Sequence, residues 1–478
     1  MPWKETDKME QKELRARYRR ECWTSDCPSH IVESLYHNPI IIGFKSRKKA
    51  HLNTDIPSYN HMATEYVKRP SYIEQMMEYY DNPEIVKVLT GIRRCGKSVM
   101  MELFRQHLLD TGVPERDVML IDLEKMRYVI DSERMLYDHI SGNIRSETPV
   151  ILIDEVQLVK GWERVVDSVR LKYNANVYIT GSNSDTVSES LGTNLTGRYV
   201  EINVFPFSFR EFVDRYPIDA DNGYTQRLIQ YLRFGGMPII DMKDNPRKNR
   251  AILRGVYDSI INHDIRPHMD IDQSILDNMT SFMISNVSHL TSYNNIAHMS
   301  YVGDPRTVEK YLGKLCECFI FYKAGRYDII GGKHLKTNAK FYLADTGFVD
   351  AILLDSEYDK GALLENAVFM ELLRRGYRVS VGSYNDREID FTAWKDGIPE
   401  FYQVAWSAEK IKVMGREVRS MAKLEGYKRI LITMDRDIRD VPEGIETLNA
   451  VDFFLRRSES RPRHLPMKEV TLPLPSSR

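Results

Sequence analysis

The sequence has few cysteines and no long hydrophobic run. Its five cysteines among 478 residues are too few and too unevenly spaced for a disulfide framework, which indicates a reducing compartment. No stretch reaches the ~18 uninterrupted apolar residues of a membrane span, and Met1 opens a charged segment without the apolar core of a signal peptide. We therefore expect a cytoplasmic protein without a membrane partner.

The sequence also lacks an excess of charge of either sign. The 67 Lys and Arg residues against 68 Asp and Glu residues give a net charge of -1, so composition supplies no overall reason to expect binding to nucleic acid or acidic lipid. Any basic surface must be local. Hydrophobic residues make up 42% of the chain, and a chain of this length is expected to fold into about two to four domains with packed cores.

The two ends of the sequence differ from the rest. Residues 1–61 carry eleven Lys or Arg against eight acids and show little apolar periodicity, and residues 458–478 are rich in proline and arginine. Both segments are expected to be disordered, the first only in part. Cys22, Cys27 and His30 lack a fourth ligand at a plausible spacing, which favours free thiols over a zinc site.

Between residues 85 and 205, short apolar runs alternate with helical stretches. The runs are 85–89, 118–121, 150–153 and 177–179. This alternation predicts an α/β fold, in which crossover helices join buried parallel strands. A more helical stretch from about 216 to 285 follows and is expected to form a lid over this core.

The first apolar run leads into a glycine-rich loop. Residues 91–98, Gly-Ile-Arg-Arg-Cys-Gly-Lys-Ser, match G-x-x-x-x-G-K-[ST] at every fixed position and precede a helical run. Such a loop surrounds a phosphate with backbone N–H groups, while Lys97 reaches the β and γ phosphates and Ser98 holds magnesium. We therefore predict a site for ATP and Mg²⁺. Its binding residues are Gly91, Arg93, Arg94, Cys95, Gly96, Lys97, Ser98 and Val99.

Polar residues follow the later apolar runs. Asp154 and Glu155 follow the third run, where Asp154 would complete the magnesium shell and Glu155 would orient or deprotonate the attacking water. Asn183, favoured over Ser182, follows the fourth run and would sense the γ-phosphate or hold the water. Arg198 is the candidate for neutralising charge in the transition state, with a surface-loop role as the alternative. The predicted catalytic residues are Lys97, Glu155, Asn183 and Arg198.

These motifs resemble those of the prokaryotic AAA-type (AAA+) ATPases that carry a C-terminal domain of unknown function related to restriction endonucleases. The similar stretches are 89–98, 153–157, 179–183, 195–199 and 206–212, followed by 342–347, 364–366, 387–391 and 402–405. The resemblance covers about residues 62–454 and implies a P-loop NTPase core, a winged helix and a restriction-endonuclease-like α/β domain. The expected domains are 62–215 for the core, 216–285 for the helical lid, 286–350 for the winged helix and 357–457 for the nuclease-like domain.

Two short helices are expected before residue 320. The first spans 292–299, and the second begins at Pro305 and has apolar residues at i, i+3, i+4 and i+7. This pattern is typical of a helix-turn-helix, with 319–322 and 340–343 as the strands of a wing. Its basic residues would contact DNA phosphates, whereas packing between domains is the alternative. They are Arg306, Lys310, Lys314, Arg326, Lys333, Lys336 and Lys340.

The resemblance to restriction endonucleases implies a second metal site. Such enzymes need an acid on a helix, an acid on a strand, and an acid or amide on the next strand with a lysine two residues later. The first three positions are taken by Glu365, Asp390 and Gln403. Ala405 takes the lysine position, so hydrolysis would need Lys410 or Lys412 as a substitute. We favour a degenerate nuclease fold used for docking or nucleic-acid binding.

The leading interpretation is a magnesium-dependent ATPase whose nucleotide state moves the lid, the winged helix and the C-terminal domain relative to one another. If Arg198 completes the active site of a neighbouring copy, the protein is expected to form a homo-oligomer. A protein partner is also compatible with this interpretation. Two alternatives stay open. One is an ATP-gated, metal-dependent DNA nuclease, and the other is a small-molecule kinase that uses the same P-loop.

Overall fold

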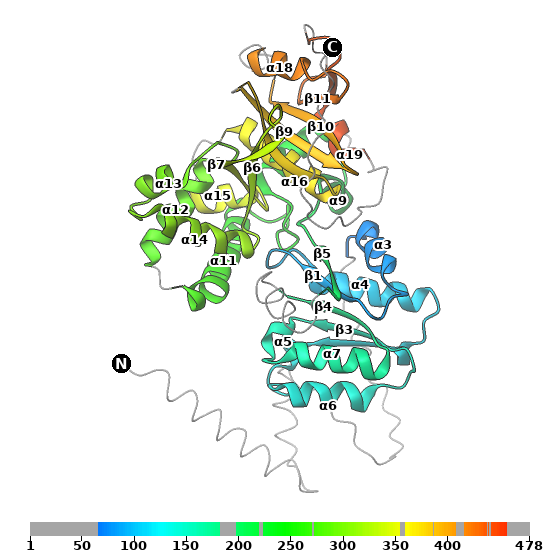
Figure 1. Cartoon of the computed structure of the whole chain (residues 1–478). Coiled ribbons are helices and arrows are strands. Elements are labelled where there is room, and N and C mark those ends of the chain that lie inside the picture. Colours follow the sequence, from blue (N-terminus) through cyan, green and yellow to red (C-terminus); the bar gives the residue numbers. More distant parts are fainter. Residues whose placement is uncertain are drawn as a thin grey trace, which may run out of the picture. The chain divides into compact units, whose positions relative to one another are not determined.

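Two β-sheets organise the described part of the chain (Figure 1). The structure, a computed structural model, describes residues 66–181, 197–218, 223–269, 272–353, 359–385, 387–407, 415–436, 438 and 441–456. All of them belong to one unit of the chain, which begins at Glu65. None of the described helices has both the length and the apolar character that crossing a membrane requires.

The first sheet contains five strands. They are β1 (Val86–Thr90), β2 (Val118–Asp122), β3 (Val150–Asp154), β4 (Asn176–Thr180) and β5 (Tyr199–Asn203). The order β2-β3-β4-β1-β5 places β1 between β4 and β5, and every pair is parallel. The predicted parallel α/β core is therefore confirmed, with strands at all four apolar runs.

Helices cover both faces of this sheet. The helical elements are α3 (Pro70–Glu78), α4 (Lys97–Asp110), η1 (Glu115–Asp117), α5 (Leu123–Met126), α6 (Glu133–Asn143), η2 (Val156–Leu158) and α7 (Trp162–Tyr173). Leu89 and Leu152 pack with α3 and α4, whereas Val88 and Ile153 pack with α6 and α7. These two pairs of helices lie on opposite faces of the sheet (Figure 1). Successive residues of a strand point to opposite faces, so both faces of the buried strands are apolar. Because the strands are parallel, their carboxyl ends meet at one edge.

A helical region follows the first sheet. It contains α9 (Phe209–Arg215), α10 (Tyr224–Phe234), α11 (Pro246–Ile260), the π-helical turn η3 (Ile261–Ile265), η4 (Arg266–His268) and α12 (Gln273–Ser285). Its helical character agrees with the expectation for 216–285. The helices of this region, however, pack into two different hydrophobic cores. Phe209 and Leu228 of α9 and α10 lie in the core of the second sheet, whereas Leu253 and Met279 of α11 and α12 share a core with the loop after β1.

The expected helix pair and hairpin come next. They are α13 (Tyr293–Met299), α14 (Pro305–Glu317), β6 (Phe321–Asp328) and β7 (Lys333–Leu343). Ser292 and Asp304 cap the two helices by accepting backbone N–H groups of the first turn. Strand β6 pairs with β7 in antiparallel and with β8 (Arg378–Tyr384) in parallel, so the hairpin belongs to the second sheet. This pairing crosses the boundary expected between 286–350 and 357–457.

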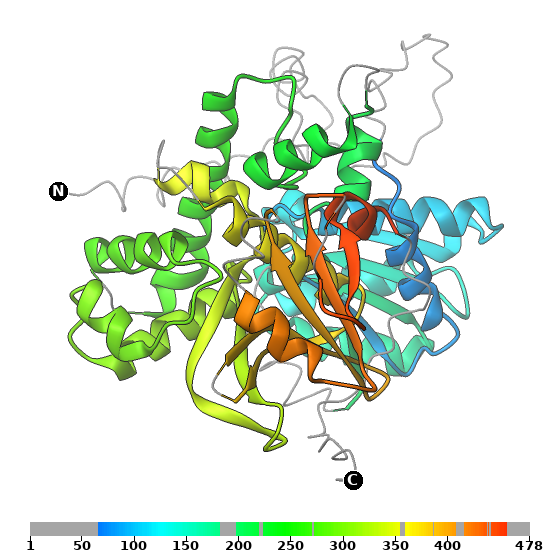
Figure 2. The ribbon, with the colours of Figure 1, turned by 90° about the horizontal axis from the view of Figure 1, so that it is seen from above.

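The second sheet is mixed, with seven strands in the order β12-β11-β10-β9-β8-β6-β7 (Figure 2). Its other elements are α15 (Gly347–Leu353), α16 (Lys360–Arg374), β8 (Arg378–Tyr384), β9 (Arg387–Lys395), β10 (Ile398–Ala405), α18 (Gly415–Ala422), β11 (Lys428–Thr433), β12 (Glu446–Asn449) and α19 (Ala450–Leu455). Helix α16 packs with Tyr402, and Met421 of α18 packs with Phe401, so these two helices lie on opposite faces. Strands β9 and β10 form an antiparallel hairpin, with Asp396 and Gly397 at its turn.

Candidate active site

The loop between β1 and α4 has the backbone shape of an anion-binding site. Gly91 has a φ of 136°, and a Cβ added there would lie 2.1 Å from the Val204 carbonyl oxygen. Gly96, with a φ of 104°, directly precedes the 14-residue helix α4. Both positions therefore require glycine. The loop leads straight into a helix N-terminus, where free backbone N–H groups favour a bound phosphate.

The ammonium of Lys97 points back into this loop. Lys97 is buried, and its Nζ donates to the carbonyl oxygens of Gly91 at 2.9 Å and Ile92 at 3.3 Å. Ser98 is exposed at the start of α4, while Cys95 is buried. A fixed cation beside a helix N-terminus fits the phosphates of a nucleotide, and the exposed hydroxyl fits a magnesium ion.

Arg93 connects the loop to a helical turn far along the chain. Its Nη1 lies 3.2 Å from Oδ1 and 3.3 Å from Oδ2 of Asp264, which belongs to the π-helical turn η3. Burial raises the pKa of the Asp264 carboxyl, while Arg93 and Lys97 oppose this rise. Sequence reasoning missed Asp264, because no spacing rule connects residues 171 positions apart.

Asp154 and Glu155 lie where β3 ends, and Thr180 holds both of them. The Thr180 hydroxyl donates to Asp154 Oδ1 and accepts the backbone N–H of Glu155 at 2.9 Å. Glu155 has a left-handed backbone with a φ of 57°, and Gln157 donates to its carboxylate. Burial raises the pKa of Glu155, although Lys97 opposes the rise. A carboxylate with a raised pKa is a stronger base toward water.

Thr180 is a site residue that sequence reasoning did not assign. It ends β4, and β4 lies beside β3, so its hydroxyl reaches the two acids across the strand pair. In the sequence, the signal that could have identified Thr180 is its place as a polar residue at the end of an apolar run. Its partners depend on the strand order, which only the folded sheet reveals. The other candidates near this strand, Ser182 and Asn183, lie outside the described residues.

Arg198 lies at the opposite edge of the sheet from the loop. It directly precedes β5, its carbonyl oxygen accepts the N–H of Val86 at 2.9 Å, and its side chain is exposed. The loop instead follows Thr90, at the other end of the same parallel pair. At ~3.3 Å per residue, five strand residues separate the two positions by about 17 Å. The fold therefore does not bring Arg198 to the phosphate loop of its own chain.

The residues predicted as a second metal site do come together. Gln403 Nε2 and the Val404 N–H each donate to Asp390 Oδ2 at 2.8 Å. Glu365 lies on α16, and Lys340 of β7 stands between it and Asp390. The expected arrangement of an acid on a helix, an acid on a strand and an amide on the next strand is thus present, with an unexpected cation inside it.

Lys340 is the cation at this cluster. Its Nζ lies 2.8 Å from Glu365 Oε1, 3.5 Å from Asp390 Oδ1 and 2.5 Å from Glu388 Oε1. The prediction that Lys340 lies at a DNA-contacting wing is wrong, because its side chain is only 3% exposed and is turned into the core. Burial and the charge of Glu365 raise the pKa of Asp390, and Lys340 opposes this rise.

This cluster fits an ammonium rather than a divalent ion. Lys340 Nζ already lies within 3.5 Å of three carboxylates, which leaves no room among them for a magnesium ion at its ~2.1 Å oxygen distance. Within the described part of the chain, no group of three or more acidic, histidine or cysteine side chains is placed to hold a metal. The proposed substitutes Lys410 and Lys412 lie outside the described residues.

Comparisons with known proteins find two family models along the chain. Residues 83–213 match the family model of an AAA domain, and residues 225–359 match a domain of unknown function, DUF8612. An uncharacterized protein of Haemophilus influenzae is 34% identical over 407 residues, which cover 83% of this chain and 100% of that protein. An uncharacterized protein of Methanocaldococcus jannaschii is 24% identical, with 81% of this chain and 89% of that protein covered.

Solved structures are similar at a lower level. An Hsp104–ADP complex of S. cerevisiae has a TM-score of 0.31 and 16% identity, with 53% of this chain and 39% of that chain covered. AMPPCP-bound DnaA from Aquifex aeolicus has a TM-score of 0.27 and 14% identity, with 52% and 88% covered. TM-scores this low do not establish a common fold over the matched length.

Proposed function

The chain belongs to the same family as the uncharacterized Haemophilus influenzae protein and contains an AAA domain, and from this premise we propose that it is a magnesium-dependent ATPase that acts as a nucleotide-driven conformational switch. One observation carries the proposal. Lys97 of the phosphate loop and the Asp154–Glu155 pair lie at the carboxyl edge of the same parallel sheet, close enough for their charges to interact. A phosphate-binding cation, a metal ligand and a base then share one site.

The loop would bind the phosphates of ATP. Backbone N–H groups of residues 91–96 and the Lys97 ammonium would contact the β and γ phosphates. Ser98 and Asp154 would hold magnesium, which neutralises phosphate charge when bound. Thr180 keeps the Asp154 carboxylate in place through its hydroxyl hydrogen bond.

Glu155 would act on the attacking water. The water oxygen bonds to the γ-phosphorus, the bond between that phosphorus and the bridging oxygen breaks, and a proton of the water passes to the Glu155 carboxylate. Its partly buried environment raises its pKa and therefore its basicity. A small-molecule kinase, with an acceptor hydroxyl in place of water, stays the alternative for this site.

The sequence raised two possible activities of the C-terminal part, DNA binding and DNA cleavage. Arg306 and Lys310 are exposed on α14, so contact with DNA phosphates is a testable property of the helix pair. Nuclease activity is disfavoured, because Lys340 neutralises the carboxylates that would bind metal. A plasmid-nicking assay with magnesium or manganese compares the wild type with Asp390→Ala, and we expect no nicking by either protein.

The proposed function is tested with Lys97→Ala. This variant removes the ammonium from the loop, so we expect ATP turnover to vanish and nucleotide binding to weaken. Phosphate release and titration with a fluorescent ATP analogue measure the two effects. Lys172→Ala, which removes an exposed lysine from α7, is the matched control. Unchanged hydrolysis in Lys97→Ala would refute the proposal.

Glu155→Gln separates binding from chemistry. The amide keeps the shape of the side chain but is not a base, so ATP should still bind while turnover stops. The same two assays apply. If Glu155→Gln binds ATP no better than Lys97→Ala does, the role of Glu155 is structural.

A further inference from the structure

The chain passes from the first sheet to the core of the second through residues 204–208, here called the junction segment. Strand β5 pairs with β1 up to Asn203. Phe209, the first residue of α9, already lies in the core of the second sheet, with its ring 6.1 Å from that of Phe454. The junction segment is therefore the covalent connection between the sheet that carries the phosphate loop and the C-terminal core.

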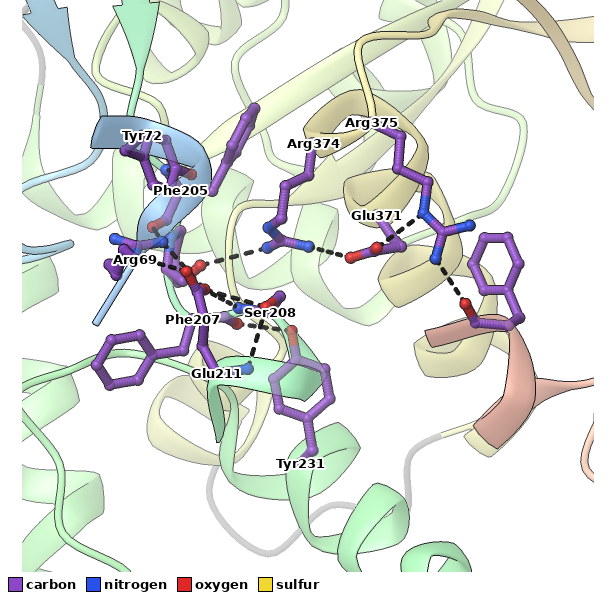
Figure 3. Close-up of polar contacts among 12 residues, drawn as sticks. Arg69, Tyr72, Phe205, Phe207, Ser208, Glu211, Tyr231, Glu371, Arg374 and Arg375 are labelled. Carbon is purple, nitrogen blue, oxygen red and sulfur yellow. Dashed lines mark hydrogen bonds and ion pairs between the residues drawn. The ribbon is translucent and has the colours of Figure 1, made fainter. Parts of the chain in front are cut away.

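Side chains from three separate elements hold the junction segment by its backbone (Figure 3). The contacts are Arg69 Nη2 to Phe205 O at 2.9 Å, Arg374 Nη2 to Pro206 O at 3.3 Å and the Tyr231 hydroxyl to Phe207 O at 2.9 Å. Arg69 precedes α3, Arg374 ends α16 and Tyr231 belongs to α10. A buried carbonyl without a partner is costly, so each donor fixes its own point of the backbone.

Arg69 extends the junction to the phosphate loop. Its side chain is 3% exposed, and its guanidinium pairs with Glu211 at 2.8 Å and donates to the Cys95 carbonyl oxygen at 3.4 Å. The first glycine of the loop is also in contact, because the Val204 carbonyl lies where a Cβ on Gly91 would be. The loop thus touches the junction segment, directly or through Arg69, at both of its ends.

Arg374 makes the corresponding contact from the second sheet. Its Nη1 lies 2.6 Å from Glu371 Oε2, and the other oxygen of Glu371 lies 2.9 Å from Nε of Arg375. Arg375 extends in another direction and donates to the Phe453 carbonyl oxygen of α19. Two neighbouring arginines therefore share one acid (Figure 3), but Arg374 reaches the junction segment while Arg375 binds within the C-terminal core.

We propose that Arg374 is a positioning residue for the nucleotide site, which acts through the junction segment and Arg69 on the shape of the phosphate loop. This inference rests on the proposed function, since it concerns the loop that would bind ATP. Coupling between two sites is reciprocal. The contact of Arg374 therefore sets the nucleotide affinity of the loop, and nucleotide binding changes the stability of α16.

Arg374→Lys tests the proposal. Lysine keeps a positive charge beside Glu371 but lacks the planar guanidinium that binds Glu371 and Pro206 O together. We expect the Kd of a fluorescent ATP analogue to rise about fivefold or more, and the nucleotide-dependent hydrogen-exchange protection of residues 360–374 to disappear. Arg375→Lys is the matched control, because Arg375 directly follows the same helix and pairs with the same acid, and it should keep wild-type affinity and protection.

The outcomes separate coupling from general damage to the helix. Wild-type affinity and protection in Arg374→Lys would overturn the proposal, and so would an equal loss in Arg375→Lys, because α16 itself would then be destabilised. Both measurements depend on binding and not on turnover. A wild type that binds ATP without hydrolysing it would refute the ATPase function, and Arg374→Lys would still decide the present inference.

Discussion

At the scale of single residues, Arg93 and Asp264 form an ion pair where a nucleotide phosphate would bind. Asp264 is 11% exposed and interacts electrostatically with Lys97 as well. A bound polyphosphate would place further negative charge beside this carboxylate, and like charges at short range repel. The ion pair therefore competes with the nucleotide for the cations of the loop.

Asp264→Asn should bind nucleotide more tightly than the wild type. Removal of one partly buried negative charge is expected to lower the Kd for ADP about fivefold, which corresponds to about 1 kcal/mol. Calorimetric titration at pH 8 and at two salt concentrations measures this, and the gain should shrink as salt rises. Asp258→Asn is the control, since Asp258 pairs with Arg254 on the exposed side of α11. Weaker binding by Asp264→Asn would mean that Asp264 holds Arg93 in its binding position.

At the scale of elements, strand β1 carries a buried lysine in the middle of the first sheet. Lys87 is completely buried, and its Nζ donates to the Asn82 carbonyl oxygen at 2.7 Å and to the side chain of Asn176. No carboxylate is among these described partners, so burial lowers the pKa of Lys87 to about 7 from its ordinary value of 10.5. The strand thus contains a group that changes charge near neutral pH.

The Lys87 side chain makes the stability of the fold depend on pH. Between pH 7 and pH 10.5 the unfolded chain holds a proton on Lys87 that the folded chain has released, so the free energy of unfolding rises with pH in this range. The slope is at most about 1.4 kcal/mol per pH unit. Relative to Lys87→Met, the wild type should therefore gain on the order of 2 to 4 kcal/mol between pH 7 and pH 10.

Urea unfolding at pH 7, 8.5 and 10 tests this dependence. Lys160→Met, which removes an exposed lysine just before α7, serves as the control and should show a nearly constant difference from the wild type. A difference between the wild type and Lys87→Met that does not change with pH would show that Lys87 stays protonated in the folded chain.

The cluster around Lys340 joins three elements of the C-terminal part. Strand β7 supplies the lysine, α16 supplies Glu365, and β9 supplies Glu388 and Asp390. Removal of the single cation would leave three buried or partly buried acids together. Loss of one partner from a buried ionic group costs about 3 to 5 kcal/mol. The lysine is therefore expected to stabilise the packing of the helix on the sheet.

Lys340→Met should lower the thermal midpoint, and a divalent ion should restore part of the loss. With the ammonium removed, Glu365 and Asp390 become available as oxygen ligands for manganese. Thermal unfolding with and without manganese measures the effect for Lys340→Met, the wild type and Lys336→Met, which removes an exposed lysine of the same strand. If manganese changed the thermal midpoint of all three proteins equally, Lys340 would not occupy a potential metal site.

At the scale of the whole molecule, local patterns predicted four of the five strands of the first sheet, but neither β5 nor the division of the chain. The four strands and the phosphate loop depend on residues adjacent in sequence, so spacing alone predicted them. The packing of α9 in the second core and the pairing of β6 with β8 depend on residues far apart. The expected boundaries near 215 and 350 therefore do not coincide with divisions between the cores.

The same distinction explains what sequence reasoning could say about the sites. Glu365, Asp390 and Gln403 were assigned through the resemblance to restriction endonucleases, and they do come together. The lysine was sought two residues after Gln403, as the spacing rule requires. The structure instead brings Lys340 from a different strand, 50 residues from Asp390 along the chain. A spacing rule along one strand cannot identify a residue that lies on a different strand of the folded sheet.

Arg198 raises the question of assembly, since its position separates it from the phosphate loop of its own chain. It is exposed at the amino edge of the first sheet, whereas the loop lies at the carboxyl edge. If Arg198 neutralises transition-state charge, it must act on a neighbouring copy. Specific ATPase activity should then rise with protein concentration, and Arg198→Ala should lose turnover while it keeps nucleotide affinity.

Mixing two inactive variants gives the sharpest test of this assembly. Arg198→Ala has an intact phosphate loop, and Glu155→Gln has an intact arginine, so a mixed oligomer contains sites in which one variant completes the other. In a 1:1 mixture about a quarter of the interfaces would be active, and turnover should recover to a similar fraction of the wild-type rate. Arg233→Ala, which removes another arginine of the chain outside the proposed site, should keep full activity alone. No recovery in the mixture, together with a specific activity independent of concentration, would leave Arg198 without a role in hydrolysis, because its own loop is about 17 Å away along the strand.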